Sequence, residues 1–413
     1  MPTPPTSVET VAAGVGPSDR LPGVKADGKG HAEAPLDWLL GPAGATFLRD
    51  AYEREPVVAH HNDPHRFRAL LSVAAVDRKV AEQDLREGML AMADAARSVD
   101  ASEFVADSGA IDRVAVARLY RRGATIILNQ LHQSDIALAD FCRSVEQVFS
   151  CHVQTNIYLT PPGSQGFHTH YDNHDVFVLQ IEGEKTWRLY DRPVEAPYRG
   201  ERFESGRHPV GEPSHSFVLR AGDCAYVPRG LMHDASASGD TASLHVTCGL
   251  LVRTWADLVL EAVSEVCVDD PAFRRGLPPG FANRDFDRTS AQAHFRALVS
   301  DLATRARMDG ALDLLTEQLI RSREPAVLGA IEGASRPVGG RYRARPSLWR
   351  LDDEDGGLRL IAPGGDMTFS RAPRSTIERA LSGDPFTPDD LGHDQAEDLI
   401  RRLTVAGLIE RVD

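Results

Sequence analysis

The chain has 413 residues and a formal charge of −14 at neutral pH, with 42% hydrophobic and 26% charged residues. This length allows two or three domains with cores of their own, and the composition is typical of a soluble globular protein. The negative charge argues against a surface that coats nucleic acid, and it favours a basic protein partner.

The beginning of the chain and its cysteines bear on the cellular compartment. Residues 1–34 are rich in Pro, Gly and small polar residues and lack the features of a secretory signal, which predicts a disordered leader. No apolar run approaches the roughly 20 residues that a membrane-spanning helix needs. Five cysteines without a CxxC pair are typical of free thiols in a reducing compartment. We therefore expect a cytoplasmic protein with no membrane contact.

Ordered structure is predicted from residue 35. Apolar residues at helical spacing precede Pro56, and a mostly helical stretch is expected to about residue 120. A β-rich run at 123–132 and a helical period at 135–149 follow. From residue 152 to 252, short β-branched or aromatic runs alternate with Pro/Gly turns. This texture predicts an antiparallel barrel or sandwich.

The remainder of the chain is predicted to be helical and then mixed. Residues 252–335 contain amphipathic segments, and a unit from about residue 340 combines short strands with two helices, as in a winged-helix-like module. Residues 372–413 hold five arginines but nine acidic residues, so we expect a protein-interaction or dimer-bracing role without nucleic-acid binding. The fold class is α+β, with predicted domains at 35–250, 251–338 and 339–413.

The stretch GFHTHYDNHDVF holds more metal-ligand side chains than one ion can use. In a straight strand, alternate residues from His168 to His174 would share one face. His233 follows a Pro-Arg-Gly turn much further along the chain and provides a distant partner. Such a pattern inside a β-rich block indicates a metal site.

Two ligand sets are chemically sensible. The first is His170, Asp172 and His233, which leaves positions open for a bidentate cosubstrate and dioxygen, as in non-haem iron(II) oxygenases. The second adds His168 and Asp175 to the two histidines in place of Asp172, the spacing of a metal-binding cupin that holds manganese, iron or zinc. Both sets remain open from the spacing alone.

Lys185 follows the turn Glu182-Gly183-Glu184, and KTWRLY is expected to pair back as the next strand. A lysine that points into a barrel needs an anion, and the distal carboxylate of 2-oxoglutarate would supply one. The alternative is a solvated lysine at a sheet edge.

Three pieces of the chain resemble the JmjC ribosomal oxygenases, which are Fe(II)- and 2-oxoglutarate-dependent hydroxylases: NIYLTPPGSQGFHTHYDNHDVFVLQIEGEKTWRLY, GDCAYVPRGLMHDASASGDTASLHVTCG and LIRRLTVAGLIERV. The match is dense over residues 155–250 and weaker over 35–413. The resemblance implies a double-stranded β-helix (jelly-roll or cupin) JmjC barrel with N-terminal helices. It also implies a helical dimerisation region and a C-terminal winged-helix domain.

The resemblance also implies roles for individual residues. His170, Asp172 and His233 match the iron ligands, and Lys185 matches the residue that binds the 2-oxoglutarate C5 carboxylate. Asn156 and His245 match residues that line the cosubstrate pocket. Gly249 stands where the family has a serine, and the histidine-rich context of the ligands also departs from the family.

The implied activity is hydroxylation of a protein side chain, most simply a histidine or arginine of a ribosomal protein. It would use Fe(II), 2-oxoglutarate and O2, and the protein is expected to form a homodimer. One alternative is hydroxylation of a peptide or a carrier-bound amino acid in a biosynthetic pathway. The other is a metal-binding cupin scaffold without turnover.

Overall fold

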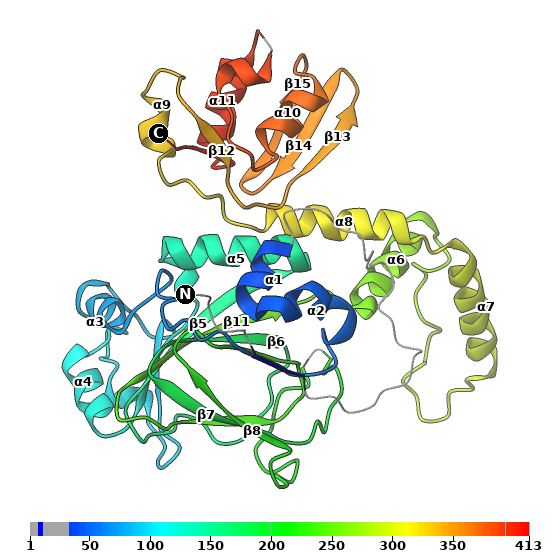
Figure 1. The fold of residues 1–413 in the computed structure, drawn as a ribbon. Helices are drawn as coiled ribbons and strands as arrows, with labels where there is room; N and C mark the ends of the chain where they lie inside the picture. The colour runs from blue at the N-terminus through cyan, green and yellow to red at the C-terminus, as the bar shows by residue number, and fades with distance from the viewer. Residues whose placement is uncertain (1–6, 11–32, 199, 393, 413) are drawn as a thin grey trace. The chain divides into compact units, whose positions relative to one another are not determined.

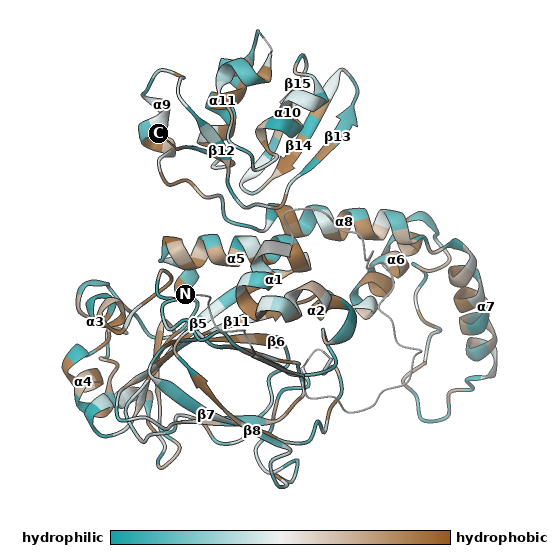
Figure 2. Ribbon diagram, viewed as in Figure 1, coloured by the Kyte–Doolittle hydropathy of each residue, from teal (hydrophilic) through white to brown (hydrophobic). Residues whose placement is uncertain are grey.

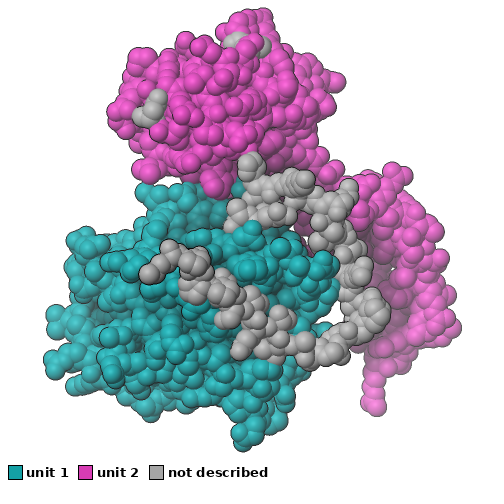
Figure 3. All heavy atoms as spheres, viewed as in Figure 1, with its two compact units in different colours: residues 1–251 teal, residues 252–413 magenta. Residues whose placement is uncertain are grey.

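The computed structural model describes residues 7–10, 33–198, 200–392 and 394–412. The chain divides into two compact units, Met1–Leu251 and Val252–Asp413, which Figure 3 shows in different colours. Each unit has a sheet and covering helices of its own.

The first unit contains an antiparallel sheet with the strand order β1-β2-β9-β6-β11-β5-β4-β3. In that order the strands are Ser7–Thr10, Val57–His60, Cys224–Val227, Asp175–Glu182, Ser243–Leu251, His152–Thr160, Thr125–Leu128 and Leu90–Ala93. Figure 1 labels the central strands of this sheet, β5, β6 and β11. A smaller antiparallel sheet has the order β10-β7-β8, with strands His233–Ala237, Glu184–Leu189 and His215–Arg220.

The inner faces of the two sheets pack on each other. One buried cluster joins Val176 and Val178 of β6 to Trp187 of β7 and Leu219 of β8. The predicted antiparallel barrel or sandwich is therefore confirmed.

Strand β6 is buried on both faces, and Figure 2 shows it as largely hydrophobic. Its outward residue Phe177 contacts Phe47 of helix α2 (Gly44–Asp50), with ring centroids 5.5 Å apart. The same ring lies 6.0 Å from that of Phe149, at the end of helix α5 (Ile136–Phe149). A strand covered on both sides is expected to hold a continuous apolar run, as VFVL at 176–179 does here.

The predicted hairpin from β6 to β7 is wrong. Strands β9 and β11 occupy both edges of β6, so β7 has no free edge there and pairs with β8 and β10 instead. The chain crosses between sheets at Gly183, where φ is +67° and a Cβ atom would lie 2.2 Å from the carbonyl oxygen of Ala242. Only glycine fits this crossing.

The N-terminal part of the unit is less helical than predicted. Its helices are α1 (Glu33–Leu40), α2, α3 (Val73–Glu82) and α4 (Arg113–Arg121), with 3-10 turns at Gly41–Ala43, Ala101–Glu103 and Leu131–Gln133. Strands β2 and β3 interrupt them because their short apolar runs pair with β9 and β4. Runs of four apolar residues do not distinguish strand from helix without knowledge of the partner.

The predicted disordered leader, residues 1–34, is partly wrong. Residues 7–10 form β1, which pairs with the open edge of β2, and helix α1 begins at Glu33. The rest of that prediction falls on residues 1–6 and 11–32, outside the described residues.

The second unit begins with helices α6 (Trp255–Asp269), α7 (Thr289–Arg305) and α8 (Met308–Arg321). Its remaining elements are α9 (Ala330–Ala334), β12 (Tyr342–Ala344), β13 (Arg350–Glu354), β14 (Gly357–Ala362), β15 (Gly365–Phe369), α10 (Arg374–Ala380), the 3-10 turn Pro388–Leu391, α11 (Ala396–Val405) and β16 (Ile409–Arg411). Strands β13, β14 and β15 form one antiparallel sheet, and β12 pairs with β16.

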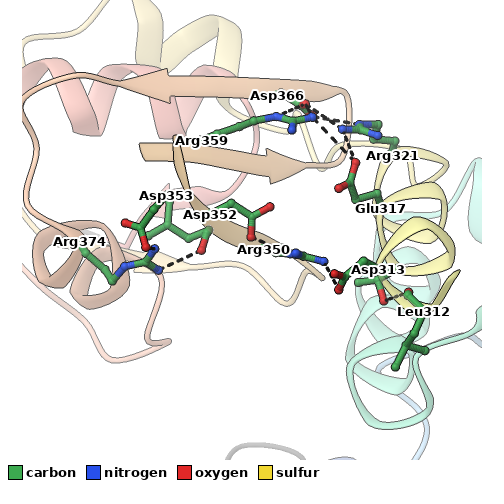
Figure 4. A network of polar contacts seen from close by, with 12 residues as sticks. Leu312, Asp313, Glu317, Arg321, Arg350, Asp352, Asp353, Arg359, Asp366 and Arg374 are labelled. Atoms are coloured by element: carbon green, nitrogen blue, oxygen red, sulfur yellow. Dashed lines mark hydrogen bonds and ion pairs between the residues drawn. The ribbon is translucent and has the colours of Figure 1, made fainter. Parts of the chain in front are cut away.

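Ion pairs join helix α8 to the three-stranded sheet (Figure 4). Asp366 of β15 accepts from Arg321 of α8 at 2.9 Å and from Arg359 of β14 at 2.6 Å. Arg350 of β13 contacts Asp313 of α8 at 2.7 Å. These contacts, together with those between α8 and β14, connect the helices to the C-terminal module within one unit.

Within the described ranges, no helix combines the length and apolar character that crossing a lipid bilayer requires.

Candidate metal centre

Three side chains from two separate segments converge in the first unit. His170 and Asp172 lie in the loop before β6, and His233 is the first residue of β10. His170 and His233 form an isolated antiparallel bridge, in which each backbone N–H donates to the other's carbonyl, at 3.0 and 2.7 Å. One potential ligand atom from each of the three residues lies within 4.8 Å of the others. The structure therefore brings together the first of the two ligand sets.

Hydrogen bonds determine which ring nitrogen of His170 and of His233 is available to a metal ion. His170 Nδ1 lies 2.8 Å from the carbonyl oxygen of His168, and His233 Nδ1 lies 3.0 Å from that of Leu231. A carbonyl only accepts, so each Nδ1 carries the proton and each Nε2 keeps a free lone pair. Carbonyl partners of this kind orient imidazole ligands in metal sites.

The protonation states also suit a cation. Burial, with a further contribution from the charge of His170, lowers the pKa of His233 to about 4, so its imidazole is neutral at neutral pH. Burial alone would raise the pKa of Asp172, but the nearby His233, His170 and His174 outweigh it and hold that pKa below its usual value. Two imidazoles with free Nε2 lone pairs and one carboxylate are a donor set that fits a divalent transition metal.

The cupin ligand set is not formed. Asp175 is completely buried, and its carboxylate is bound by Arg229 at 2.7 Å and by the Tyr226 hydroxyl at 2.8 Å. His168 is exposed. The prediction that His168 to His174 share one face of a strand is wrong, because the chain bends through residues 166–174 and the strand begins only at Asp175.

His174 lies beside the ligands and close to Gly249 of β11. A Cβ atom built on Gly249 would lie 2.7 Å from the His174 ring. Gly249, where the resemblance implies a serine, thus leaves room for the His174 ring. These two differences from the pattern that the resemblance implies lie next to each other in the structure.

The candidate ligands open into a cavity of about 310 Å³, which is near the lower end of the range for small-molecule sites. Residues from both sheets and from the loop before β6 line it: Thr125, Tyr158, Gly166, Phe167, His170, Asp172, Val176, Val178, Lys185, Trp187, Val227, His233, Asp234, Ala235, His245 and Thr247. Half of these residues are apolar or aromatic, and the other half carry polar or ionisable side chains.

Lys185 is one of these polar groups and is only 4% exposed, so it is not a solvated edge residue. Its Nζ lies 3.1 Å from Thr160 Oγ1 and 3.5 Å from His245 Nδ1. Burial lowers the pKa of Lys185 to about 7, and burial together with Lys185 lowers the pKa of His245 well below its usual value. The lysine therefore lacks a negative partner among the described residues, and an anion bound here would stabilise its ammonium form.

His245 lies where the sequence predicts, on the cavity wall. Its ring stacks on Tyr158 with centroids 4.8 Å apart and packs edge-on against Trp187 at 5.8 Å. Tyr158, Trp187 and Thr160 are not among the predicted site residues, although strand alternation offers a signal for them. Tyr158 and Thr160 share a face of β5, and Trp187 shares a face of β7 with Lys185.

Asn156 is not among the residues that line the cavity. Its side-chain oxygen accepts a hydrogen bond from the backbone N–H of Gln130 at 2.9 Å, and its carbonyl accepts one from Thr247 at 3.3 Å. A contact between Asn156 and a cosubstrate stays a prediction.

A second polar cluster stabilises the loop that carries His170. Asp234, next to His233, accepts hydrogen bonds from Thr169 Oγ1 at 2.8 Å and from the Tyr190 hydroxyl at 2.5 Å. Arg188 of β7 binds its other oxygen at 2.8 Å. The loop is thereby joined to two strands of the small sheet.

Known proteins resemble this chain in sequence over the region that holds the candidate metal ligands. Residues 128–258 match the JmjC domain family model. The chain is 31% identical over 365 residues to ribosomal oxygenase 1 from Bos taurus, covering 80% of this chain and 54% of the relative. It is 28% identical over 346 residues to the bifunctional lysine-specific demethylase and histidyl-hydroxylase NO66 from Drosophila yakuba, covering 78% of this chain and 50% of that protein. The chain thus spans about half the length of these relatives.

A solved structure extends the likeness to the fold. The ribosomal oxygenase YcfD from Escherichia coli, in complex with cobalt and 2-oxoglutarate, superposes with a TM-score of 0.52 at 14% identity. The superposition covers 90% of this chain and 99% of YcfD. At this identity the match shows a shared fold and does not by itself assign an activity.

Proposed function

This chain belongs to the JmjC-domain ribosomal oxygenase family, and on that premise we propose that it is an Fe(II)- and 2-oxoglutarate-dependent oxygenase that hydroxylates a protein side chain. The observation that carries the proposal is the pairing of a His170–Asp172–His233 cluster with a buried, unneutralised Lys185 in one cavity. A metal-only scaffold would not need a buried cation on the same cavity wall.

The residues present fit the metal and its cosubstrate. The two Nε2 atoms and the Asp172 carboxylate would hold Fe(II) on one side, and Lys185 would bind the far carboxylate of 2-oxoglutarate. When bound, Fe(II) and 2-oxoglutarate supply, with O2, the oxidising chemistry that inserts oxygen into a C–H bond while 2-oxoglutarate becomes succinate and CO2.

The protein's own contribution is to position the metal ligands and the cosubstrate, and to exclude water from the cavity. The carbonyls of His168 and Leu231 keep the Nδ1 protons on the two histidines, so their Nε2 atoms stay available. The Trp187, Val176 and Val178 side chains provide an apolar wall that strengthens the interaction between Lys185 and a carboxylate.

The proposed substrate is a histidine or arginine side chain of a ribosomal protein. The name of the cattle relative supports a ribosomal target, and that of the Drosophila relative includes histidyl-hydroxylase. An acidic chain with a formal charge of −14 also suits the basic surface of a ribosomal protein. We propose that the reaction takes place in the cytoplasm, where such a substrate is found, without direct nucleic-acid binding by the C-terminal module.

Mass spectrometry of ribosomal proteins tests this proposal. We expect one ribosomal peptide to gain the mass of one oxygen atom in cells that carry the gene, and to lose it when the gene is deleted. Complementation with the wild-type gene should restore the modification, whereas complementation with Asp172→Ala should not. Ribosomal peptides of unchanged mass in all four strains would point instead to a free peptide or carrier-bound amino acid as the substrate.

We also propose that the helical region of the second unit forms a homodimer. Helices α6, α7 and α8 each present a pair of apolar side chains at i, i+4 spacing, all between 45% and 65% exposed: Trp255 and Val259, Phe295 and Val299, and Met308 and Leu312. Helix α6 packs against both α7 and α8, so the pairs belong to one helical cluster. A second copy of the same cluster is the partner that would cover them.

Sedimentation equilibrium at micromolar concentration should give about twice the chain mass of 45.1 kDa. The double variant Val259→Glu and Phe295→Glu would bury unpaired charges in the interface, so it should sediment as a monomer. The matched control is Val114→Glu, which changes an exposed valine of α4 and should leave the dimer intact. A monomeric wild-type protein would rule out the dimer.

A further inference from the structure

A buried ion-pair network lies next to the candidate metal ligands. The guanidinium of Arg229, in the turn before β10, lies 2.7 Å from Asp175 Oδ2 and 2.6 Å from Glu53 Oε1. The other oxygen of Asp175 accepts hydrogen bonds from the Tyr226 hydroxyl at 2.8 Å and from the backbone N–H of Arg229 at 3.2 Å. Asp175 is fully buried and Arg229 is 7% exposed, so both charges depend on these partners.

The backbone next to this network contacts a ligand residue directly. The N–H of Gly230 donates to the carbonyl oxygen of Asp172 at 2.9 Å. Gly230 has φ of +83°, and a Cβ atom there would lie 1.9 Å from the carbonyl oxygen of Val194, so the turn requires glycine. Arg192 donates two hydrogen bonds to the carbonyl oxygen of Arg229, at 3.0 and 2.7 Å, and holds the turn from its other side.

These contacts join the two ligand-bearing segments at both ends. Asp172 lies three residues before Asp175, and His233 lies three residues after Gly230. The segments are bonded through His170 and His233 on one side of the cluster. On the other side they are bonded through Asp172 and Gly230, and through Asp175 and Arg229. The distance between the ligands is therefore set by bonds that the ligand side chains do not themselves make.

We infer that Asp175, Arg229 and Glu53 are positioning residues that hold Asp172 and His233 at the separation that metal binding requires. The inference rests on the proposed function, because it assumes that a divalent metal binds the three ligands. Glu53 lies in the connection between α2 and β2, so the network also links the metal centre to the N-terminal part of the unit. Asp175 binds both the guanidinium and the backbone N–H of Arg229, so loss of its charge weakens the bonds that hold the turn at 228–231 beside Asp172.

The test uses Mn²⁺ as the probe, with no 2-oxoglutarate and no protein substrate. Titration of the purified full-length protein, followed by the electron paramagnetic resonance signal of free Mn²⁺, gives a dissociation constant. We expect Asp175→Asn to weaken Mn²⁺ binding by about 10- to 100-fold, the range found for residues that orient metal ligands. Glu53→Gln removes the more exposed partner and should cause a smaller loss in the same direction.

The matched control is Asp135→Asn. Asp135 pairs with Lys79 at 2.9 Å and caps helix α5, so this variant should lower the melting temperature through an unrelated ion pair. If it leaves the Mn²⁺ affinity unchanged while Asp175→Asn lowers it, the effect is local to the metal centre. Equal losses of affinity in both variants would overturn the inference, because general destabilisation would then explain them.

The remaining outcomes are also decisive. If Asp175→Asn does not fold, Glu53→Gln carries the test, and wild-type Mn²⁺ affinity in that variant would overturn the inference. Wild-type affinity in both variants would do so while leaving the proposed function intact. A wild-type protein that binds no Mn²⁺ would refute the proposed function, and the positioning role with it.

Discussion

Replacing Asp172 by alanine is expected to abolish conversion of 2-oxoglutarate to succinate. The substitution removes the one carboxylate of the three-residue cluster, and with it the only anionic ligand that the cluster offers a divalent metal. We expect metal affinity to fall by more than the roughly 10- to 100-fold that is typical of residues outside the ligand set. Succinate formation and Mn²⁺ titration measure the two effects separately.

The matched control for this prediction is His168→Ala. His168 is exposed and contributes its backbone carbonyl to His170 Nδ1, which alanine retains. Turnover in this variant should therefore stay close to that of the wild type. Loss of turnover in His168→Ala with retention in Asp172→Ala would show that the ligands are those of the cupin set after all.

Replacing Lys185 by methionine is expected to raise the KM for 2-oxoglutarate by roughly 10- to 100-fold. A hydrogen bond to a charged group contributes about 1.5–3 kcal/mol, and about 1.4 kcal/mol corresponds to a tenfold change in affinity. Methionine fills a similar volume, and it removes a buried ammonium that only Thr160 and His245 contact in the described structure. Hence the melting temperature should not fall.

Lys79→Met is the control, because Lys79 pairs with Asp135 away from the cavity. Its KM for 2-oxoglutarate should match that of the wild type. An unchanged KM in Lys185→Met would show that the cosubstrate binds elsewhere.

The same lysine predicts a pH dependence. Burial lowers its pKa to about 7 in the free protein, and the ammonium form is the one that binds a carboxylate. Affinity for 2-oxoglutarate should therefore be constant below pH 7, and above it should fall by about tenfold per pH unit until the neutral form dominates binding. In Lys185→Met this decline should disappear, which a series of isothermal titrations between pH 6 and 9 would show.

The ligand cluster could be predicted because a His-x-Asp pair and a distant histidine are a rare combination of residue types. The choice between Asp172 and Asp175 could not be made from spacing, since it depends on Arg229 and Tyr226, which occupy Asp175 in the fold. Asp175 lies only three residues after Asp172. Its partners lie more than fifty residues away.

The strand pattern was predictable, but its pairing was not. Alternating and apolar runs located β5, β6 and β7, whereas the assumption that β6 and β7 form a hairpin overlooked two later strands that fill both edges of β6. For the same reason the sequence predicts a helical stretch where the structure has β2 and β3. Local sequence predicts that a segment is a strand more readily than it predicts which strands pair with it. The pairing depends on residues that are distant in the sequence.

The register of the small sheet fixes the spacing of two residues that line the cavity, Lys185 and His233. Lys185 pairs with Ala237 and Leu189 pairs with His233, so Lys185 and His233 lie four residue pairs apart on one ladder between β7 and β10. The backbone hydrogen bonds between β7 and β10 thus set the distance between Lys185 and His233, and no loop is involved. Insertions in the surrounding loops leave that distance unchanged. A slip of one residue in β7 would turn both Lys185 and Trp187 out of the cavity together.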